Sequence, residues 1–315
     1  MGPAKRARLR IRIAARRWGI PMRRPRFGRG ATAPDIAVLA SLRDEKSSQP
    51  AWPVLAEHGA LQVRIAESKH DVKAAQRLRY HIFYQEMSAI PNRRMRLQKR
   101  DFDKYDRFCD HMLVVDRDSR DEFGDPAVVG TYRLLRGEVA ARHGGYYTSS
   151  EYDLSSVMAN NGRGTRYLEL GRSCVLKSYR GKPITMQLLW KGIMVYVERY
   201  RIDVMFGCGS LPGTDPEALK LPLSYLHHFH RAPETQHLRA RPELYVSMNR
   251  MPRDAIEPKA AMRKLPPLIK GYIRAGAVIG DGAVIDRQFG TTDVLIYFPV
   301  SQIGTKYRSR FNATE

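Results

Sequence analysis

Cysteine is scarce in this sequence, and long apolar runs are missing. Three cysteines stand among 315 residues, at positions 109, 174 and 208, and no two of them form a CxxC pair. A disulfide framework or a cysteine zinc site is therefore not expected, and a reducing compartment fits. No stretch of about 18 apolar residues occurs, so the sequence predicts no transmembrane helix.

Acidic residues are missing altogether from the first 34 positions, which hold one lysine and ten arginines. The whole chain carries a formal net charge of +22. The first 34 residues, called the basic arm below, supply half of this excess, and the rest of the chain is moderately basic. Both parts favour a negatively charged partner, which can be anionic lipid, nucleic acid or an acidic protein.

The composition of the arm, residues 1–34, leaves several interpretations open. Its arginines are mixed with aliphatic residues and Trp18, which suits an anionic membrane surface, where each basic residue contributes about 1 kcal/mol. A flexible basic tail and an organellar transit peptide share that composition. Nucleic acid is not expected as a partner, because no zinc-finger, RNP or helix-turn-helix pattern follows. Residues 35–60 contain several prolines and serines and are predicted to be a linker.

The rest of the chain, residues 61–315, predicts strands that alternate with helices. Strands are expected at 61–67, 111–116, 127–135, 165–176 and 204–208. Helices are expected at 71–87, 183–201 and 215–230, with Pro183 in a first turn, where its missing N–H is harmless. Residues 91–110 are expected to form a charged loop. This order indicates an α/β (α+β) domain whose mixed sheet is flanked by helices.

Two charged residues, Glu169 and Arg172, interrupt the predicted strand at 165–176. Ionised side chains are rarely buried without a partner, so both need an explanation. One explanation is a structural ion pair, with Arg133 or Asp106 as the partner. The other is catalysis, in which Glu169 accepts a proton directly or through water.

The turn after that strand, residues 177–183, is basic and leads into the next predicted helix. Free backbone N–H groups around Gly181 and at the helix N-terminus favour an anion, and Lys177, Arg180 and Lys182 add positive charge. Neither a Walker loop nor a GxGxxG fingerprint is present, so the turn alone does not identify the anion.

A third group combines Arg79 and Phe83 with the acidic run Asp101, Asp103 and Asp106. Closely spaced carboxylates can hold a cationic substrate or a metal, or they form a solvated loop. The calcium-loop pattern is missing, and the histidines at 227, 228 and 230 diverge around a helix instead of converging. No metal is therefore expected.

Several stretches resemble known acyltransferases. The spacing of Arg79, Asp103, Arg133 and Glu169 resembles that of acyl-homoserine-lactone synthases. A closer resemblance, to the ornithine Nα-acyltransferases of bacterial ornithine-lipid synthesis, is carried by residues 167–175, 207–216 with 222–227, and 265–277 with 291–296. Together with the Arg79 region, the resemblance covers residues 61–305 and leaves residues 1–60 outside.

The resemblance implies a GNAT-like fold, with a mixed, mostly antiparallel twisted sheet followed by a C-terminal extension. It implies an enzyme that moves a 3-hydroxyacyl chain from acyl carrier protein to the α-amine of L-ornithine, giving lyso-ornithine lipid. The donor is the carrier's phosphopantetheine thioester, and no tightly bound cofactor is expected. The expected location is the bacterial cytoplasm, peripheral at the inner membrane, with the basic arm on the anionic surface.

Within this reaction, each residue singled out receives an expected role. Glu169 is the expected base, through water, and Tyr179 the expected acid for the departing thiolate, while Arg172 and Arg133 meet acidic groups of the carrier or the ornithine carboxylate. The strand near Cys174 and Val175 is expected to offer an N–H to the thioester oxygen. Arg79, Phe83, Asp103 and Asp106 are expected to bind the substrate, although Asp103 and Asp106 can instead pair structurally with Arg79. Lys177, Arg180, Gly181 and Lys182 are expected to bind phosphopantetheine and the carrier.

The sequence leaves other functions open. One alternative is a carrier-dependent N-acyltransferase that acts on a different amino acid or forms a homoserine lactone. Another, outside the enzymes, is a basic protein that binds nucleic acid or a membrane, or a membrane-bound scaffold with an inactive acyltransferase fold.

Overall fold

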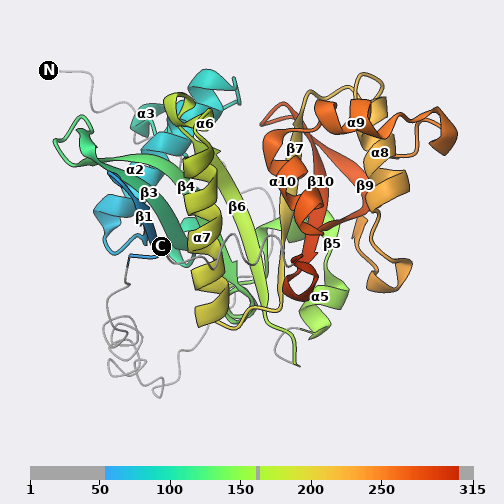
Figure 1. Cartoon of the computed structure of the whole chain (residues 1–315), viewed down its shortest axis with the longest axis horizontal. Coiled ribbons are helices and arrows are strands. Elements are labelled where there is room, and N and C mark those ends of the chain that lie inside the picture. Colours follow the sequence, from blue (N-terminus) through green and yellow to red (C-terminus); the bar gives the residue numbers. More distant parts are fainter. Residues whose placement is uncertain (1–53, 161–163, 305–315) are drawn as a thin grey trace, which may run out of the picture. The chain divides into compact units, whose positions relative to one another are not determined.

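The computed structural model describes residues 54–160 and 164–304, so the basic arm lies outside the described residues (Figure 1). The sheet begins within the segment expected to be linker. Leu55 is buried, and strand β1 (Ala56–His58) pairs antiparallel with β2 (Leu61–Ile65). In the described part of the chain, no helix is long and apolar enough to cross a membrane.

Ten strands within the described residues form a sheet in the order β1-β2-β3-β4-β6-β7-β10-β9-β8-β5. The others are β3 (Asp110–Arg120), β4 (Pro126–Arg136), β5 (Tyr152–Asp153), β6 (Tyr167–Val175), β7 (Val204–Pro212), β8 (Arg239–Ala240), β9 (Val278–Asp286) and β10 (Thr291–Pro299). Only the pairs β6–β7 and β8–β9 are parallel. The predicted mixed, mostly antiparallel sheet is therefore confirmed.

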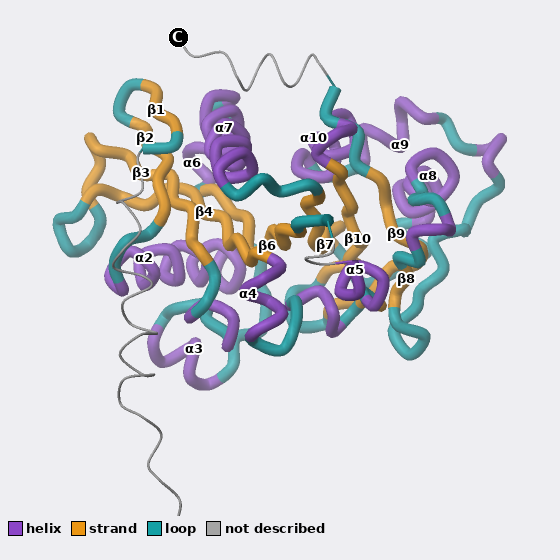
Figure 2. The backbone as a smooth tube through the Cα atoms, turned by 90° about the horizontal axis from the view of Figure 1, so that it is seen from below, coloured by secondary structure: helices purple, strands orange, loops and turns teal. Residues whose placement is uncertain are grey.

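Two helices cover opposite faces of the first half of the sheet, α7 (Pro183–Arg199) and α2 (Lys69–Tyr80) (Figure 2). Alternate residues of β3 point to opposite faces. Met112 packs in the same cluster as Leu189 of α7, whereas Leu113 packs against Ala75 of α2. The apolar runs of these strands therefore serve two cores.

The segment from residue 68 to residue 110 is more helical than expected. A capping box between Ser68 and Asp71 starts α2, which continues as the π-helix η2 (His81–Glu86). The expected charged loop at 91–110 contains two short helices, α3 (Arg93–Gln98) and η3 (Lys104–Arg107), capped by Asn92 and Asp103. The loop prediction was wrong there because helices of one turn are too short to show a periodic pattern.

The C-terminal part supplies the strand beside β7. Strand β10 pairs with β7 over nine residues, and β9 follows on the outside. Helix α10 (Pro267–Ala275) packs on the same face as α7, through Tyr272 against Trp190. The remaining helices are α4 (Gly137–Arg142), η4 (Tyr147–Ser150), α5 (Ser155–Asn160), α6 (Lys177–Arg180), α8 (Lys220–His230), η5 (Glu234–Gln236), η6 (Arg253–Ala255), α9 (Pro258–Lys264) and η7 (Val300–Gln302).

Candidate active site

Strands β6 and β7 run side by side for three residue pairs and then separate. The last pair is Glu169 with Phe206. Beyond it, β6 stays paired with β4 and β7 with β10, so the separation opens a gap inside the sheet. Gly207 lies where the strands diverge, and a Cβ there would be 2.2 Å from the carbonyl oxygen of Leu170. Only glycine allows this close approach.

A bulge in β6 borders the gap. Between the pairs Arg133–Gly171 and Thr131–Cys174, β6 has two residues where β4 has one. The first of the two, Arg172, has a left-handed φ of 50°, which is a strained backbone conformation for a residue other than glycine. Strain of this kind persists where surrounding contacts hold it, and it is common at functional sites.

The backbone of Val175 faces the gap. The N–H of the next residue, Leu176, donates to the Val129 carbonyl on the β4 side. Backbone groups of successive strand residues point to opposite sides, so the N–H and carbonyl of Val175 point away from β4. The carbonyl accepts a hydrogen bond from Arg180 Nε at 2.7 Å. The Val175 N–H therefore points toward the side on which β7 has moved away.

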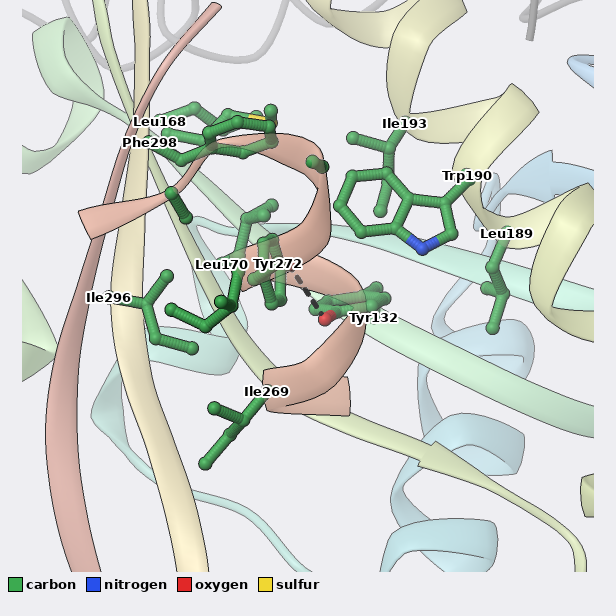
Figure 3. Packing of buried hydrophobic residues seen from close by; sticks show 14 of the residues in the cluster. Tyr132, Leu168, Leu170, Leu189, Trp190, Ile193, Ile269, Tyr272, Ile296 and Phe298 are labelled. Atoms are coloured by element: carbon green, nitrogen blue, oxygen red, sulfur yellow. Dashed lines mark hydrogen bonds between the residues drawn. The ribbon is translucent and has the colours of Figure 1, made fainter. Parts of the chain in front are cut away.

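A cavity of about 450 Å³ occupies the gap, and it has an apolar and a polar part. Figure 3 shows the hydrophobic core that adjoins the apolar part, where the phenols of Tyr132 and Tyr272 hydrogen-bond at 3.0 Å. The apolar lining includes Leu170, Met186, Met205, Leu268, Tyr272, Ile296 and Phe298. The polar lining includes Thr148, Glu169, Arg172, Cys208, Ser210 and Asp293.

The two parts of the cavity lie on opposite faces of the sheet. Leu170 and Met205 belong to the core under α7 and α10. Their neighbours Glu169 and Phe206 point to the other face, toward η4 and the tyrosine-rich core there. The gap therefore connects a long apolar space with a polar one, and Glu169 stands at the junction.

Glu169 is buried and held by backbone groups. Its two carboxylate oxygens accept hydrogen bonds from the N–H groups of Tyr147, at 3.0 Å, and Thr148, at 2.7 Å. Burial raises the pKa of Glu169, while these donors act in the opposite direction. Of the structural ion pairs considered from the sequence, Glu169 forms none with Arg133, whereas Arg172 is paired, with Asp101 and Asp103 in place of Asp106. Each oxygen has a second lone pair, so the carboxylate can still bind a water in the cavity.

A buried network of three arginines and three aspartates lies beside the gap. The guanidinium of Arg79 is fully buried and contacts Asp101 and Asp106, each at 2.8 Å. The other pairs are Arg133 with Asp103 at 2.7 Å and Asp106 at 3.6 Å, and Arg172 with Asp101 at 3.3 Å and Asp103 at 3.4 Å. The charges balance, and the network ties α2 and the 101–106 segment to β4 and β6.

The network shows the structural alternative for Arg79 and Asp106, which pair directly, while Asp103 pairs with Arg133. None of the three lines the cavity, so their substrate-binding role stays a prediction that this placement does not favour. Arg133 lines the cavity but is likewise held by aspartates. Arg172 reaches the cavity between the rings of Tyr147, at 4.7 Å, and Phe289, at 4.9 Å.

Known proteins resemble this chain along most of its length. The model of the acetyltransferase (GNAT) domain matches residues 78–191. The L-ornithine N(alpha)-acyltransferase of Rhizobium meliloti (strain 1021) is 47% identical over 264 residues, which cover 84% of this chain and 88% of that protein. The chain belongs to the L-ornithine N(alpha)-acyltransferase family.

One further relative and one solved structure extend the comparison. The L-ornithine N(alpha)-acyltransferase of Agrobacterium fabrum (strain C58 / ATCC 33970) is 46% identical, covering 80% of this chain and 85% of that protein. The solved structure of an N-acyl amino acid synthase from uncultured soil microbes covers 79% of this chain and 94% of that one, with 11% identity and a TM-score of 0.44. The chain is thus an acyltransferase with a GNAT domain, as the sequence resemblance implied.

Within this family member, Tyr179 does not stand where a catalytic acid is needed. Its phenol donates a hydrogen bond to Asp116 on β3 at 2.5 Å and lies outside the cavity lining. Its expected role as the acid for the thiolate stays a prediction, which this placement does not favour. The cause is local, because α6 turns the side chain toward β3 and away from the gap.

Cys174, Val175 and Phe83 do line the cavity. Burial raises the pKa of the Cys174 thiol to about 12, so it is inert and packs against Leu78 and Ile82. Phe83 meets Phe289 edge to face, with the ring centroids 5.6 Å apart.

The basic turn forms an exposed rim. Lys177, Gly181 and Lys182 are exposed, and Arg180 lines the cavity while it pairs with Glu86 at 2.6 Å. Lys182 lies over the ring of Tyr179 at 4.6 Å. The turn stands at the end of β6, just beyond Val175.

Sequence reasoning missed the contribution of the C-terminal part to the cavity. Cys208 and Ser210 come from β7 and Asp293 from β10. The available signal was the position of Asp293 in an otherwise apolar strand, the same signal that singled out Glu169. The histidines of α8 bind separate partners, since His228 contacts the Met251 carbonyl and His230 the Tyr225 phenol.

Proposed function

We propose that this protein transfers a 3-hydroxyacyl chain from acyl carrier protein to the α-amine of L-ornithine, giving lyso-ornithine lipid. The observation that carries the proposal is the cavity through the gap between β6 and β7, with a buried carboxylate at its centre. Its apolar part suits a fatty acyl chain, and its polar part suits a charged amino acid.

The reaction is a direct transfer between two bound substrates. The neutral α-amine of ornithine attacks the thioester carbonyl carbon, and the negative charge on the carbonyl oxygen is stabilised by the Val175 N–H. Glu169 takes the excess amine proton through a water, and the raised pKa of its carboxyl suits a base that works near neutral pH. The carbon–sulfur bond then breaks, and the thiolate recovers that proton through the same water.

Arg172 is the cavity's candidate for the carboxylate of ornithine. Its guanidinium carries five N–H donors, more than its two aspartate contacts require. The aromatic rings on both sides fix its plane, which favours a paired contact with a carboxylate. The guanidinium lies over the ring of Tyr147, whose backbone N–H binds Glu169.

The acyl donor enters from the side of the basic turn. Phosphopantetheine is a phosphodiester on an acidic carrier, and the exposed side chains of Lys177 and Lys182 complement both charges. From this rim, an extended thiol arm reaches Val175 and continues into the gap. The cytoplasmic face of the inner membrane is the proposed location, with residues 1–34 on the anionic surface.

The test combines the purified protein, 3-hydroxyacyl carrier protein and a panel of amino acids, and follows free carrier thiol and product mass. Acylated ornithine with equimolar thiol is the expected result. The same panel with acyl-coenzyme A in place of the carrier tests the donor, and slower transfer from coenzyme A is expected. Thiol release only with another amino acid would overturn ornithine as the acceptor. No release from folded protein would overturn the proposal altogether.

A further inference from the structure

Two buried carboxylates that the reaction above does not use lie at the polar part of the cavity: Asp293 lines it, and Glu151 lies behind Cys208. Glu151 is 8% exposed and Asp293 is 6% exposed. With Cys208 they form a group whose oxygen and sulfur atoms all lie within 4.8 Å of one another. Cys208 lies 3.1 Å from Glu151, and the hydroxyl of Thr291 donates to Asp293 at 2.8 Å.

These two carboxylates differ from the aspartates of the arginine network, because they form no ion pair within the described residues. Asp101, Asp103 and Asp106 are each paired with arginines. Across residues 54–160 and 164–304, neither Glu151 nor Asp293 forms an ion pair with a lysine, arginine or histidine. Two uncompensated carboxylates this close are costly to bury. The charge of Arg172 acts on both carboxylates, but its guanidinium is already paired with Asp101 and Asp103.

The group lies beside Glu169. The N–H of Thr148 donates to Glu169 at 2.7 Å, and the hydroxyl of the same Thr148 lies 3.8 Å from the Cys208 sulfur. Asp293 pairs with Ser210, two residues beyond Cys208 on β7, and it lines the cavity. All of these side chains share one face of the sheet. A bound molecule can therefore reach Glu169 with one end and Asp293 with the other.

We infer that Glu151 and Asp293 form the subsite for the cationic side chain of the amino-acid acceptor. Asp293 receives the terminal ammonium directly, and Glu151 adds negative charge from behind Cys208. The inference rests on the proposed function, since it assumes that the α-amine of the same molecule lies at Glu169. It assigns the specificity for a diamino acid to residues of β10 and of the segment before β5.

A metal ion is the rival occupant, because a carboxylate, a thiolate and a second carboxylate are metal ligands. Metal binding needs the ionised thiol. Burial, together with the adjoining Glu151, raises the pKa of the Cys208 thiol well above its usual value. An ammonium ion needs only the carboxylates, and the acceptor itself supplies it.

The test compares L-ornithine with L-norvaline, which has the same carbon chain without the terminal amine. We expect the wild-type protein to favour ornithine by at least about 100-fold in kcat/KM, because a site built for a buried charge rejects an analogue that lacks it. In Asp293→Asn, kcat/KM for ornithine should fall about 10- to 100-fold, mainly through KM. Turnover of norvaline should stay within about two-fold of wild type. Glu151→Gln should show the same pattern with a smaller effect.

Asp281→Asn is the matched control, because Asp281 is also an aspartate of the sheet but pairs with Arg231 and Arg239 outside the cavity lining. This substitution should leave kcat/KM unchanged for both ornithine and norvaline. The inference is overturned if Asp293→Asn keeps the wild-type preference for ornithine, or if its kcat/KM falls equally for both substrates. It is also overturned if the wild type acylates norvaline and ornithine with equal kcat/KM. Stoichiometric zinc in the purified protein that is lost in Asp293→Asn would establish the metal site instead. A wild type that acylates neither substrate would remove the proposed function itself.

Discussion

Replacing Arg79 should lower the free energy of unfolding far more than replacing an arginine of a surface ion pair. Arg79 is completely buried and faces two carboxylates, Asp101 and Asp106. Arg79→Met would leave Asp101 with Arg172, at 3.3 Å, and Asp106 with Arg133, at 3.6 Å, as their nearest arginines. Removing one partner of a buried ion pair lowers the free energy of unfolding by about 3–5 kcal/mol. Because two arginines remain close to the aspartates, we expect a loss of about 3 kcal/mol.

Arg64→Met is the matched control for that substitution. Arg64 also forms a two-pronged contact with an aspartate, Asp71, at 2.6 and 3.1 Å, but its side chain is 28% exposed. A pair of this kind contributes at most about 1 kcal/mol. Urea denaturation of both variants gives the two free energies of unfolding. Equal losses would refute the conclusion that the network stabilises the region around the gap, and so would full rescue by Arg79→Lys, which cannot make the forked contact.

Three further predictions concern single positions. Burial and the nearby Asp293 raise the pKa of Glu151 from 4.5 to about 7, so the folded state keeps a proton that the unfolded state releases. Wild-type stability should therefore fall, by up to about 3 kcal/mol, between pH 5 and pH 8 relative to Glu151→Gln; parallel urea-unfolding profiles would contradict this. Gly207→Ala should cost about 1–3 kcal/mol and lower turnover, since its Cβ meets the Leu170 carbonyl; an unchanged melting temperature and rate would contradict it. Tyr179→Phe should lose about 1 kcal/mol of stability but keep turnover within two-fold, and a large loss of rate would restore Tyr179 as the acid.

The sequence was informative wherever one segment carries its own signal. The strand at 165–176 and the helix that begins at Pro183 were placed to within a few residues because apolar periodicity and a helix-start residue identify them. The two short helices at 93–107 were missed, since each depends on a single capping side chain, Asn92 or Asp103.

The candidate site was predictable in part. Glu169 and Val175 were found because a charge in an apolar strand and a basic turn after it are local features, and both residues line the cavity. For Asp103 and Asp106 two roles stayed open, because nothing along the chain tells an aspartate that binds a substrate from one that pairs with an arginine folded against it; the structure shows the ion pairs. Asp293 carried a local signal, an acid in an apolar strand, but its proximity to Glu151 arises only when β10 pairs with β7.

The most direct test of the account is single-turnover acyl transfer to ornithine by Glu169→Gln. We expect the rate of thiol release to fall about 10²- to 10⁴-fold, with the KM for ornithine little changed, because the carboxylate is needed for the proton and not for binding. Glu138→Gln is the control, since Glu138 is an exposed residue paired with Arg136, and it should leave the rate unchanged. Thermal melting verifies that both variants are folded. If folded Glu169→Gln transfers the acyl chain at the wild-type rate, the carboxylate at the gap is not the base, and the proposed mechanism is wrong.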